Sequence, residues 1–150
     1  MVTDKDKGWI NIKKELEVLQ GSSTKVGLQA GEMVNGEPQL TLAELGSIHE
    51  FGTKDGDIPA RPFMATTFDE STDSIKQFTD QLRSQVMKGT IRARQAVALL
   101  GEWYEGKVKR KIDSIKYPPN APTTIARKGS SKPLIDSSQM RNSIRHVEED

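Results

Sequence analysis

Residues 91–115 read IRARQAVALLGEWYEGKVKRKIDSI, and this stretch decides the fold. Apolar side chains recur along it at spacings of three and four residues, which is the period of an amphipathic helix. They are Ala93, Val97, Leu100, Tyr104, Val108, Ile112 and Ile115. A second set with helical spacing precedes it, formed by Phe68, Ile75, Phe78, Leu82 and Val86. Only about three residues join the two segments, so the pattern predicts two long helices in an antiparallel hairpin.

Two capping-box sequences predict where helices begin. In Thr41-Leu-Ala-Glu44 and again in Thr67-Phe-Asp-Glu70, a threonine is followed three residues later by a glutamate. Both side chains of such a pair bond to backbone N–H groups in the first turn of a helix. The first box predicts a short helix that stops at Gly52, and the second predicts that the first long helix begins at Thr67.

The remaining segments predict a third helix and a small sheet. Residues 9–20 carry apolar side chains at helical spacing, whereas residues 25–30 and, more weakly, 142–148 alternate as strands do. The two strand segments are expected to pair. Asp136-Ser-Ser-Gln139 resembles a capping sequence and predicts a helical turn before the last strand.

These elements together predict one α+β domain over residues 1–150. Its small antiparallel or mixed sheet packs against an antiparallel pair of long helices plus an N-terminal helix. Glycine and proline interrupt the pattern in three places, which are expected to be mobile loops: 31–39 (a loop or a hairpin tip), 53–62 and 116–133.

Composition excludes several classes of protein. The chain has no cysteine, so disulfides, thiolate metal sites and cysteine nucleophiles are excluded. No apolar run approaches the ~18–20 residues of a membrane span, and the charged N-terminus does not read as a secretory signal. Only 34% of the residues are apolar, which favours an oligomeric partner that covers part of the surface.

The net charge of +1 conceals a division along the chain. Residues 1–80 carry 8 basic and 14 acidic side chains, whereas residues 81–150 carry 14 basic and 7 acidic ones. The two sets of charges either interleave when the chain folds or form an acidic and a basic face. In the second case identical copies would dock head to tail.

No residue pattern indicates catalysis. His49-Glu50 resembles the start of a zinc-protease motif, but that motif requires a second histidine where Thr53 stands. The sequence also contains no nucleophile elbow and no phosphate-binding P-loop. We therefore expect no enzyme activity, no cofactor and no metal, and a metal-dependent peptidase stays the least favoured hypothesis.

A basic cluster predicts contact with phosphates. Four cations gather near the end of the second long helix, and three more follow in the proline-rich segment. They are Lys107, Lys109, Arg110 and Lys111, then Arg127, Lys128 and Lys132. Aromatic platforms for single strands are scarce, so non-specific contact with DNA is favoured over sequence-specific binding. A small nucleic-acid-binding protein is thus the alternative function.

Residues 48–63, IHEFGTKDGDIPARPF, fit none of these chemistries. Two prolines stiffen the backbone around Arg61, which suits a planar, bidentate partner such as Glu50. The segment is either a latch that packs Phe51 and Phe63 under a loop or part of a subunit interface. Candidate residues for either role are His49, Glu50, Phe51, Gly52, Arg61, Pro62, Phe63, Arg127 and Lys128.

Three blocks of this sequence resemble the neck and tail-completion proteins of tailed phages. The blocks are residues 48–63, the stretch PPNAPTTIARKG at 118–129 with KPLID at 132–136, and MRNSI at 140–144. Their order and spacing also fit, and the likeness covers roughly residues 8–148. One departure is Ser137-Ser138, where Thr-Gly is more usual in that family.

The resemblance implies a structural protein of the virion, assembled in the host cytoplasm. It implies an α+β domain whose copies form a ring at the head–tail junction or the tail end, often with six-fold symmetry. Neighbouring connector and tail proteins, and DNA in the channel touched non-specifically, would be its partners, and no membrane is involved. No catalytic residues come with the family.

Overall fold

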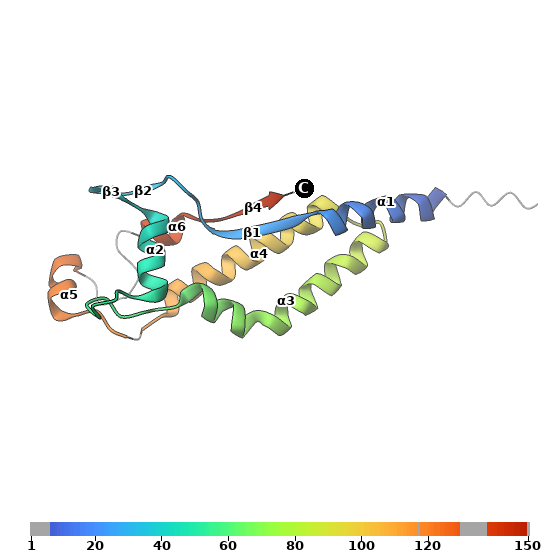
Figure 1. Cartoon of the computed structure of the whole chain (residues 1–150). Helices are drawn as coiled ribbons and strands as arrows, with labels where there is room; N and C mark the ends of the chain where they lie inside the picture. Colours follow the sequence, from blue (N-terminus) through green and yellow to red (C-terminus); the bar gives the residue numbers. More distant parts are fainter. Residues whose placement is uncertain (1–6, 117, 130–137, 150) are drawn as a thin grey trace, which may run out of the picture. The chain divides into compact units, whose positions relative to one another are not determined.

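The computed structural model describes residues 7–116, 118–129 and 138–149. Six helices and two small antiparallel sheets are present in these residues, which confirms the α+β class (Figure 1). In chain order the elements are α1 (Lys7–Gly21), β1 (Ser23–Leu28), β2 (Met33–Val34), β3 (Glu37–Thr41), α2 (Leu42–Phe51), α3 (Phe63–Met87), α4 (Ala93–Ser114), α5 (Pro122–Lys128), α6 (Gln139–Asn142) and β4 (Ile144–Glu149).

The chain forms two compact units, and α3 and α4 each contribute to both. Among the described residues, unit 1 comprises 7–25, 72–103 and 146–149, and unit 2 comprises 26–71, 104–116, 118–129 and 138–145. Strand β1 pairs with β4, as the alternating patterns of the two segments predict. None of the helices in the described part of the chain is both long enough and apolar enough to cross a bilayer.

Unit 1 is built around the turn between the two long helices. Leu82, Val86, Ala93 and Ala96 are buried together, and the ring of Phe78 stacks on Trp103 with centroids 5.0 Å apart. The connection covers residues 88–92, somewhat longer than the expected three or so residues, and α4 begins at Ala93.

A glutamate of α1 explains where α4 begins. The Glu15 carboxylate accepts the backbone N–H of Ala93 at 2.7 Å and the Arg92 guanidinium at 2.8 Å. These two contacts lower the pKa of Glu15. An acidic group at this end of a helix is stabilised by the helix dipole. The cap comes from a residue far away in sequence, and no local pattern predicts it.

Unit 2 has its own apolar core. Its fully buried side chains are Leu42, Phe63, Val108, Ile112, Met140 and Ile144. The expected stripe of the second long helix supplies two of these, Val108 and Ile112, which confirms the helical period in this half of α4.

Residues 31–39 form a hairpin rather than an open loop. Strand β2 pairs antiparallel with β3, with Met33 opposite Thr41 and an irregularity after Met33. Gln139 of α6 holds the hairpin on the β2 side, because its side chain donates to Met33 O and accepts from Asn35 N–H, each at 2.8 Å. Ser143 donates to the Glu32 carboxylate at 2.6 Å.

Two predicted helix starts have different outcomes. The capping box at Thr41 is confirmed, since Thr41 accepts from Glu44 N–H and the Glu44 carboxylate accepts from Thr41 N–H. The box at Thr67 is wrong, because α3 already begins at Phe63. Thr67 lies inside the helix, where its hydroxyl donates to the carbonyl of Phe63 at 2.5 Å.

The segment 116–133 also differs from the expected loop. It contains α5, which begins at Pro122 in the first helical turn, where a missing N–H costs nothing. Ser138 precedes α6 with φ +59° and makes no side-chain cap. Asp136 and Ser137 of the predicted capping sequence, and residues 130–133 of the loop, lie outside the described residues.

Acidic and basic halves of the sequence pair with each other inside the units. Glu15 pairs with Arg92 in unit 1, and Glu70 pairs with Lys111 in unit 2. In a third pair the signs are reversed: Lys25, a cation of the acidic half, pairs with Glu149, an acid of the basic half. These contacts favour the interpretation that the two charge sets interleave on folding.

Candidate functional site

The candidate site lies in unit 2, where α2 ends and the chain turns back towards α3. Helix α2 is fixed at its start by the Thr41 capping box and ends at Gly52, whose N–H donates to Ile48 O at 2.8 Å. Gly52 has φ +72°, a region that glycine enters at little cost.

Position 52 requires glycine for two reasons: its positive φ and the lack of room for a side chain. A Cβ atom placed on it would lie 2.8 Å from Ala60 N and 2.8 Å from Ile58 O. Both atoms belong to the backbone and cannot rotate away. Gly52 is therefore the point where the two ends of the loop 53–62 come into contact.

The loop itself is held by hydrogen bonds within it. Thr53 N–H donates to Ile58 O at 2.9 Å, and Thr53 Oγ1 accepts from Ile58 N–H at 3.0 Å. The Asp55 carboxylate accepts from Asp57 N–H at 3.1 Å. Hydrogen bonds from the Thr53 hydroxyl and from Asp57 N–H lower the pKa of Asp55. The segment between Thr53 and Ile58 is thus a closed turn.

The backbone of Arg61 contacts α2, and the residue is almost completely buried. Its N–H donates to His49 O at 2.7 Å, and the residue is only 4% exposed. The guanidinium donates to the carbonyl oxygens of Pro118 at 2.7 Å and Pro119 at 3.0 Å. A longer contact of 3.4 Å reaches Asn120 Oδ1. Burial lowers the pKa of Arg61, although a guanidinium stays charged in proteins.

The predicted pairing of Arg61 with Glu50 is wrong. Each side chain of the predicted pair bonds instead to backbone groups. The Glu50 carboxylate accepts the backbone N–H groups of Met64 and Ala65, each at 2.9 Å. It therefore satisfies unpaired donors in the first turn of α3 and complements the helix dipole there. This contact explains why α3 begins at Phe63.

The two phenylalanines of the signature have opposite environments. Phe63 is 1% exposed and belongs to the core of unit 2. Phe51, the last residue of α2, is 78% exposed. The latch interpretation thus holds for Phe63 only. Pro62 is exposed, and its carbonyl accepts from Thr66 N–H at 3.2 Å in the first turn of α3.

A hollow of about 410 Å³ lies beside the buried arginine. It brings together His49, Arg61 and Arg127 among the sequence-predicted residues. Asp57 and Asn120 also line it, and the sequence had singled out neither. Lys128 is the last residue of α5, and its side chain is outside the described part. Arg61 contacts residues 118 and 119 through their backbone carbonyls. Such contacts leave no recognisable motif in the sequence.

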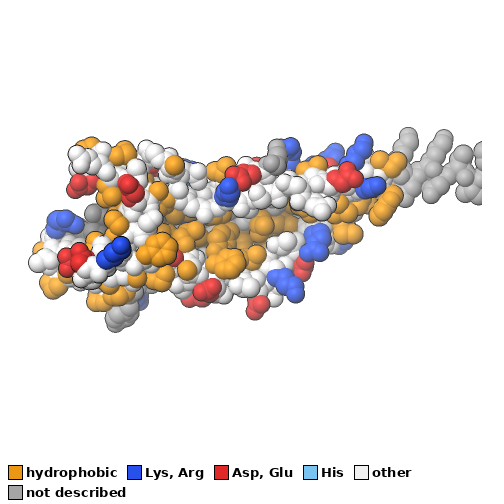
Figure 2. Space-filling model, in the orientation of Figure 1, with side chains coloured by type: hydrophobic (Ala, Val, Ile, Leu, Met, Phe, Trp, Pro, Cys, Tyr) orange, Lys and Arg blue, Asp and Glu red, His pale blue; other side chains and the backbone are white. Residues whose placement is uncertain are grey.

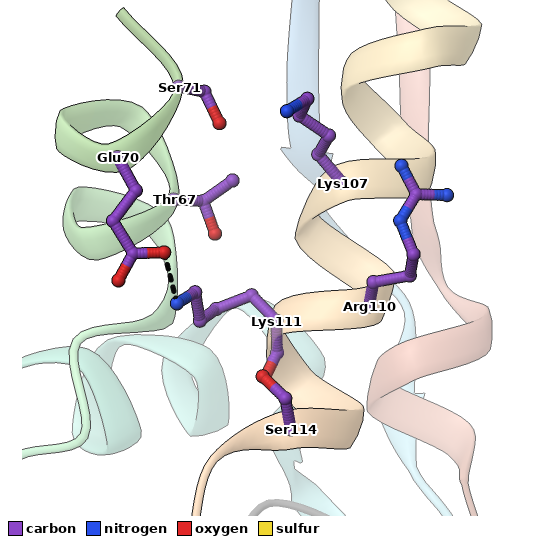
Figure 3. A pocket seen from close by; sticks show the side chains of 7 residues that line it. All are labelled: Thr67, Glu70, Ser71, Lys107, Arg110, Lys111 and Ser114. Atoms are coloured by element: carbon purple, nitrogen blue, oxygen red, sulfur yellow. Dashed lines mark hydrogen bonds and ion pairs between the residues drawn. The ribbon is translucent and has the colours of Figure 1, made fainter.

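The predicted DNA-contacting lysines and arginine do not act as one group. Lys107, Arg110 and Lys111 line a second hollow of unit 2 (Figure 3). Lys109 instead forms an ion pair with Glu105, one turn earlier on α4. Four residues of that hollow were missed as site residues by the sequence analysis, namely Thr67, Glu70, Ser71 and Ser114.

The described residues contain no cluster of three or more histidine, cysteine, aspartate or glutamate side chains that would hold a metal ion. Two charged side chains of the turn bond mainly to backbone atoms: Glu50 to N–H groups and Arg61 to carbonyls. Phe51 is exposed and lies directly between two residues held in this way, Glu50 and Gly52.

Comparison of the chain with protein-family models, curated proteins and solved structures found no match.

Proposed function

We propose that this chain is a structural subunit of a tailed-phage neck or tail-completion ring, in which Phe51 inserts into the neighbouring copy. One observation carries the proposal: a large aromatic side chain, 78% exposed, stands between Glu50, whose carboxylate accepts two backbone N–H groups, and Gly52, whose N–H donates to Ile48 O. Aromatic side chains on a rigid support lose little conformational entropy on binding. They are also frequent among the residues that dominate interface energies.

The sequence resemblance supports the same role. The first of its three blocks, residues 48–63, forms the turn described above, in which Glu50 and Arg61 bond mainly to backbone atoms. Other large apolar side chains are exposed as well, and Figure 2 shows apolar groups on the visible face. They include Trp9, Ile10, Phe68 and Met87.

The proposal predicts that self-association depends on Phe51. Burying a phenylalanine side chain contributes about 2–3 kcal/mol, so Phe51→Ser should weaken each contact between copies by roughly 30- to 150-fold. The measurement is sedimentation velocity across a wide concentration range. Phe68→Ser is the matched control, because it removes another exposed phenylalanine that is outside the signature.

A wild-type chain that stays monomeric at high concentration, together with normal virions when the gene is deleted, would overturn the proposal. Electron microscopy of particles made without the protein then distinguishes two positions in the virion. Full heads beside separate tails indicate a head–tail joining subunit, whereas overlong tails indicate a tail terminator.

A further inference from the structure

A second hollow of unit 2, of about 280 Å³, lies between α3 and α4 (Figure 3). On the α3 side it is lined by Thr67, Glu70 and Ser71, and on the α4 side by Lys107, Arg110, Lys111 and Ser114. Thr67 and Ser71 are only 2% and 4% exposed. The hollow therefore has a buried polar wall on one helix and a cationic wall on the other.

The helical period places the cations on one face of α4. Lys107, Arg110 and Lys111 stand at positions i, i+3 and i+4, which are neighbours on a helix surface. The Arg110 guanidinium lies over Gly106, where a Cβ would be 3.4 Å from its Nη1. In Figure 3, Lys107 and Lys111 extend towards α3, whereas Arg110 runs along α4.

The lining residues carry a surplus of positive charge. Three of them are cationic, and Glu70 is the one carboxylate among them. Glu70 forms an ion pair with Lys111, whose side chain is 18% exposed. The hydroxyls of Thr67 and Ser114 already donate to the carbonyls of Phe63 and Lys111. The donors that a ligand would meet are thus mainly those of the lysines and the arginine.

We propose that this hollow binds a phosphate group, with the cations of α4 as donors and with Glu70 as the internal competitor for Lys111. A phosphate ester carries up to about two negative charges and three acceptor oxygens. The three cations and one carboxylate of the hollow have a net charge that balances it. Arginine and lysine are the side chains that bind phosphate most often. The phosphate comes from a free phosphate compound or from a nucleic-acid backbone, since both present the same chemistry. The site does not depend on the proposed ring function.

The test measures phosphate binding to the full chain by NMR titration of backbone amides, with inorganic phosphate against chloride at matched ionic strength. Lys107→Gln and Lys111→Gln should each weaken binding on the order of tenfold, because each removes a charge-assisted donor. Lys109→Gln is the matched control, because Lys109 lies on the same helix but does not line the hollow. It should change the affinity less than twofold.

Glu70→Gln should change the phosphate affinity in the opposite direction. It releases Lys111 and removes the competing carboxylate, so phosphate should bind several-fold more tightly. Asp73→Asn removes one negative charge from an exposed position of α3 that does not line the hollow, and it should leave the affinity unchanged. Circular dichroism and thermal unfolding of each variant check that it is folded.

Two results would overturn the proposal: no phosphate-dependent shifts at the lining residues, or equal losses in Lys107→Gln and Lys109→Gln. Fluorescence anisotropy with a labelled DNA duplex then identifies the source. Duplex binding that weakens in Lys107→Gln and strengthens in Glu70→Gln assigns the hollow to a nucleic-acid phosphate. Phosphate binding without duplex binding assigns it to a free phosphate compound.

Discussion

Replacing Arg61 by alanine is expected to open the contact between the start of α3 and residues 118–120. The change removes three hydrogen bonds from one guanidinium, to Pro118 O at 2.7 Å, Pro119 O at 3.0 Å and Asn120 Oδ1 at 3.4 Å. It leaves carbonyl groups without their donors in a region where Arg61 itself is 4% exposed.

The expected loss is about 3 kcal/mol. A hydrogen bond to a charged group contributes roughly 1.5–3 kcal/mol, and two of the three bonds here are of normal length. The sum is reduced because the buried guanidinium no longer has to be desolvated. Arg61→Lys should lie between wild type and Arg61→Ala, since an ammonium keeps the charge but cannot reach several carbonyls as a planar fork does.

Hydrogen exchange measures this loss locally, which matters because a chain with two compact units need not unfold in one step. The amide of residue 61, which donates to His49 O in the wild type, should exchange about two orders of magnitude faster in Arg61→Ala. Lys54→Ala, an exposed change in the same loop, should stay within about 0.5 kcal/mol of wild type. If both variants exchange at the same rate, Arg61 does not hold this region and the reasoning fails.

Three further predictions concern the same turn. Gly52→Ala should lower the free energy of unfolding in urea by about 3 kcal/mol. Gly56→Ala should lower it by only about 1 kcal/mol, because Gly56 also has a positive φ (+80°) but has open space around its Cβ position. Equal losses in the two variants would show that backbone crowding at Gly52 is unimportant. Glu50→Gln should cost about 1 kcal/mol and speed amide exchange in the first turn of α3, and unchanged exchange there would contradict its capping role. Because the pKa of Asp55 is lowered on folding, its contribution to the turn is present above its ordinary pKa of 3.8 and is lost as pH falls through the folded value. NMR titration should therefore show the turn loosening below pH 3.8, and Asp55→Asn should abolish that step.

Local sequence patterns predicted the elements whose causes are local. The capping box at Thr41 is such a case, since both partners lie within four residues. The pairing of the segment at 25–30 with the last strand was also predicted, because two alternating segments in a mostly helical chain have few other partners. The long helices followed from the period of their apolar residues.

Distant contacts account for the errors. Thr67 has a capping-box sequence, but the carboxylate of Glu50 supplies a cap to residues 64 and 65, so the helix starts one turn earlier. In unit 1, Glu15 likewise fixes the start of α4 from a distant element. The partner of Arg61 was mispredicted because a carboxylate is the expected acceptor, whereas the real acceptors are main-chain carbonyls 57 and 58 residues away.

That choice of acceptors has an evolutionary consequence. A salt bridge ties the identities of two residues together, and a change in one selects for a change in the other. Main-chain carbonyls are present whatever side chain a residue carries, so Pro118 and Pro119 are recognised by the path of their backbone alone. Variants at these two positions that preserve the extended path should be tolerated, and Arg61 should vary independently of their identity. An alignment of relatives would then contain no coupled pair to reveal these two contacts of a buried arginine.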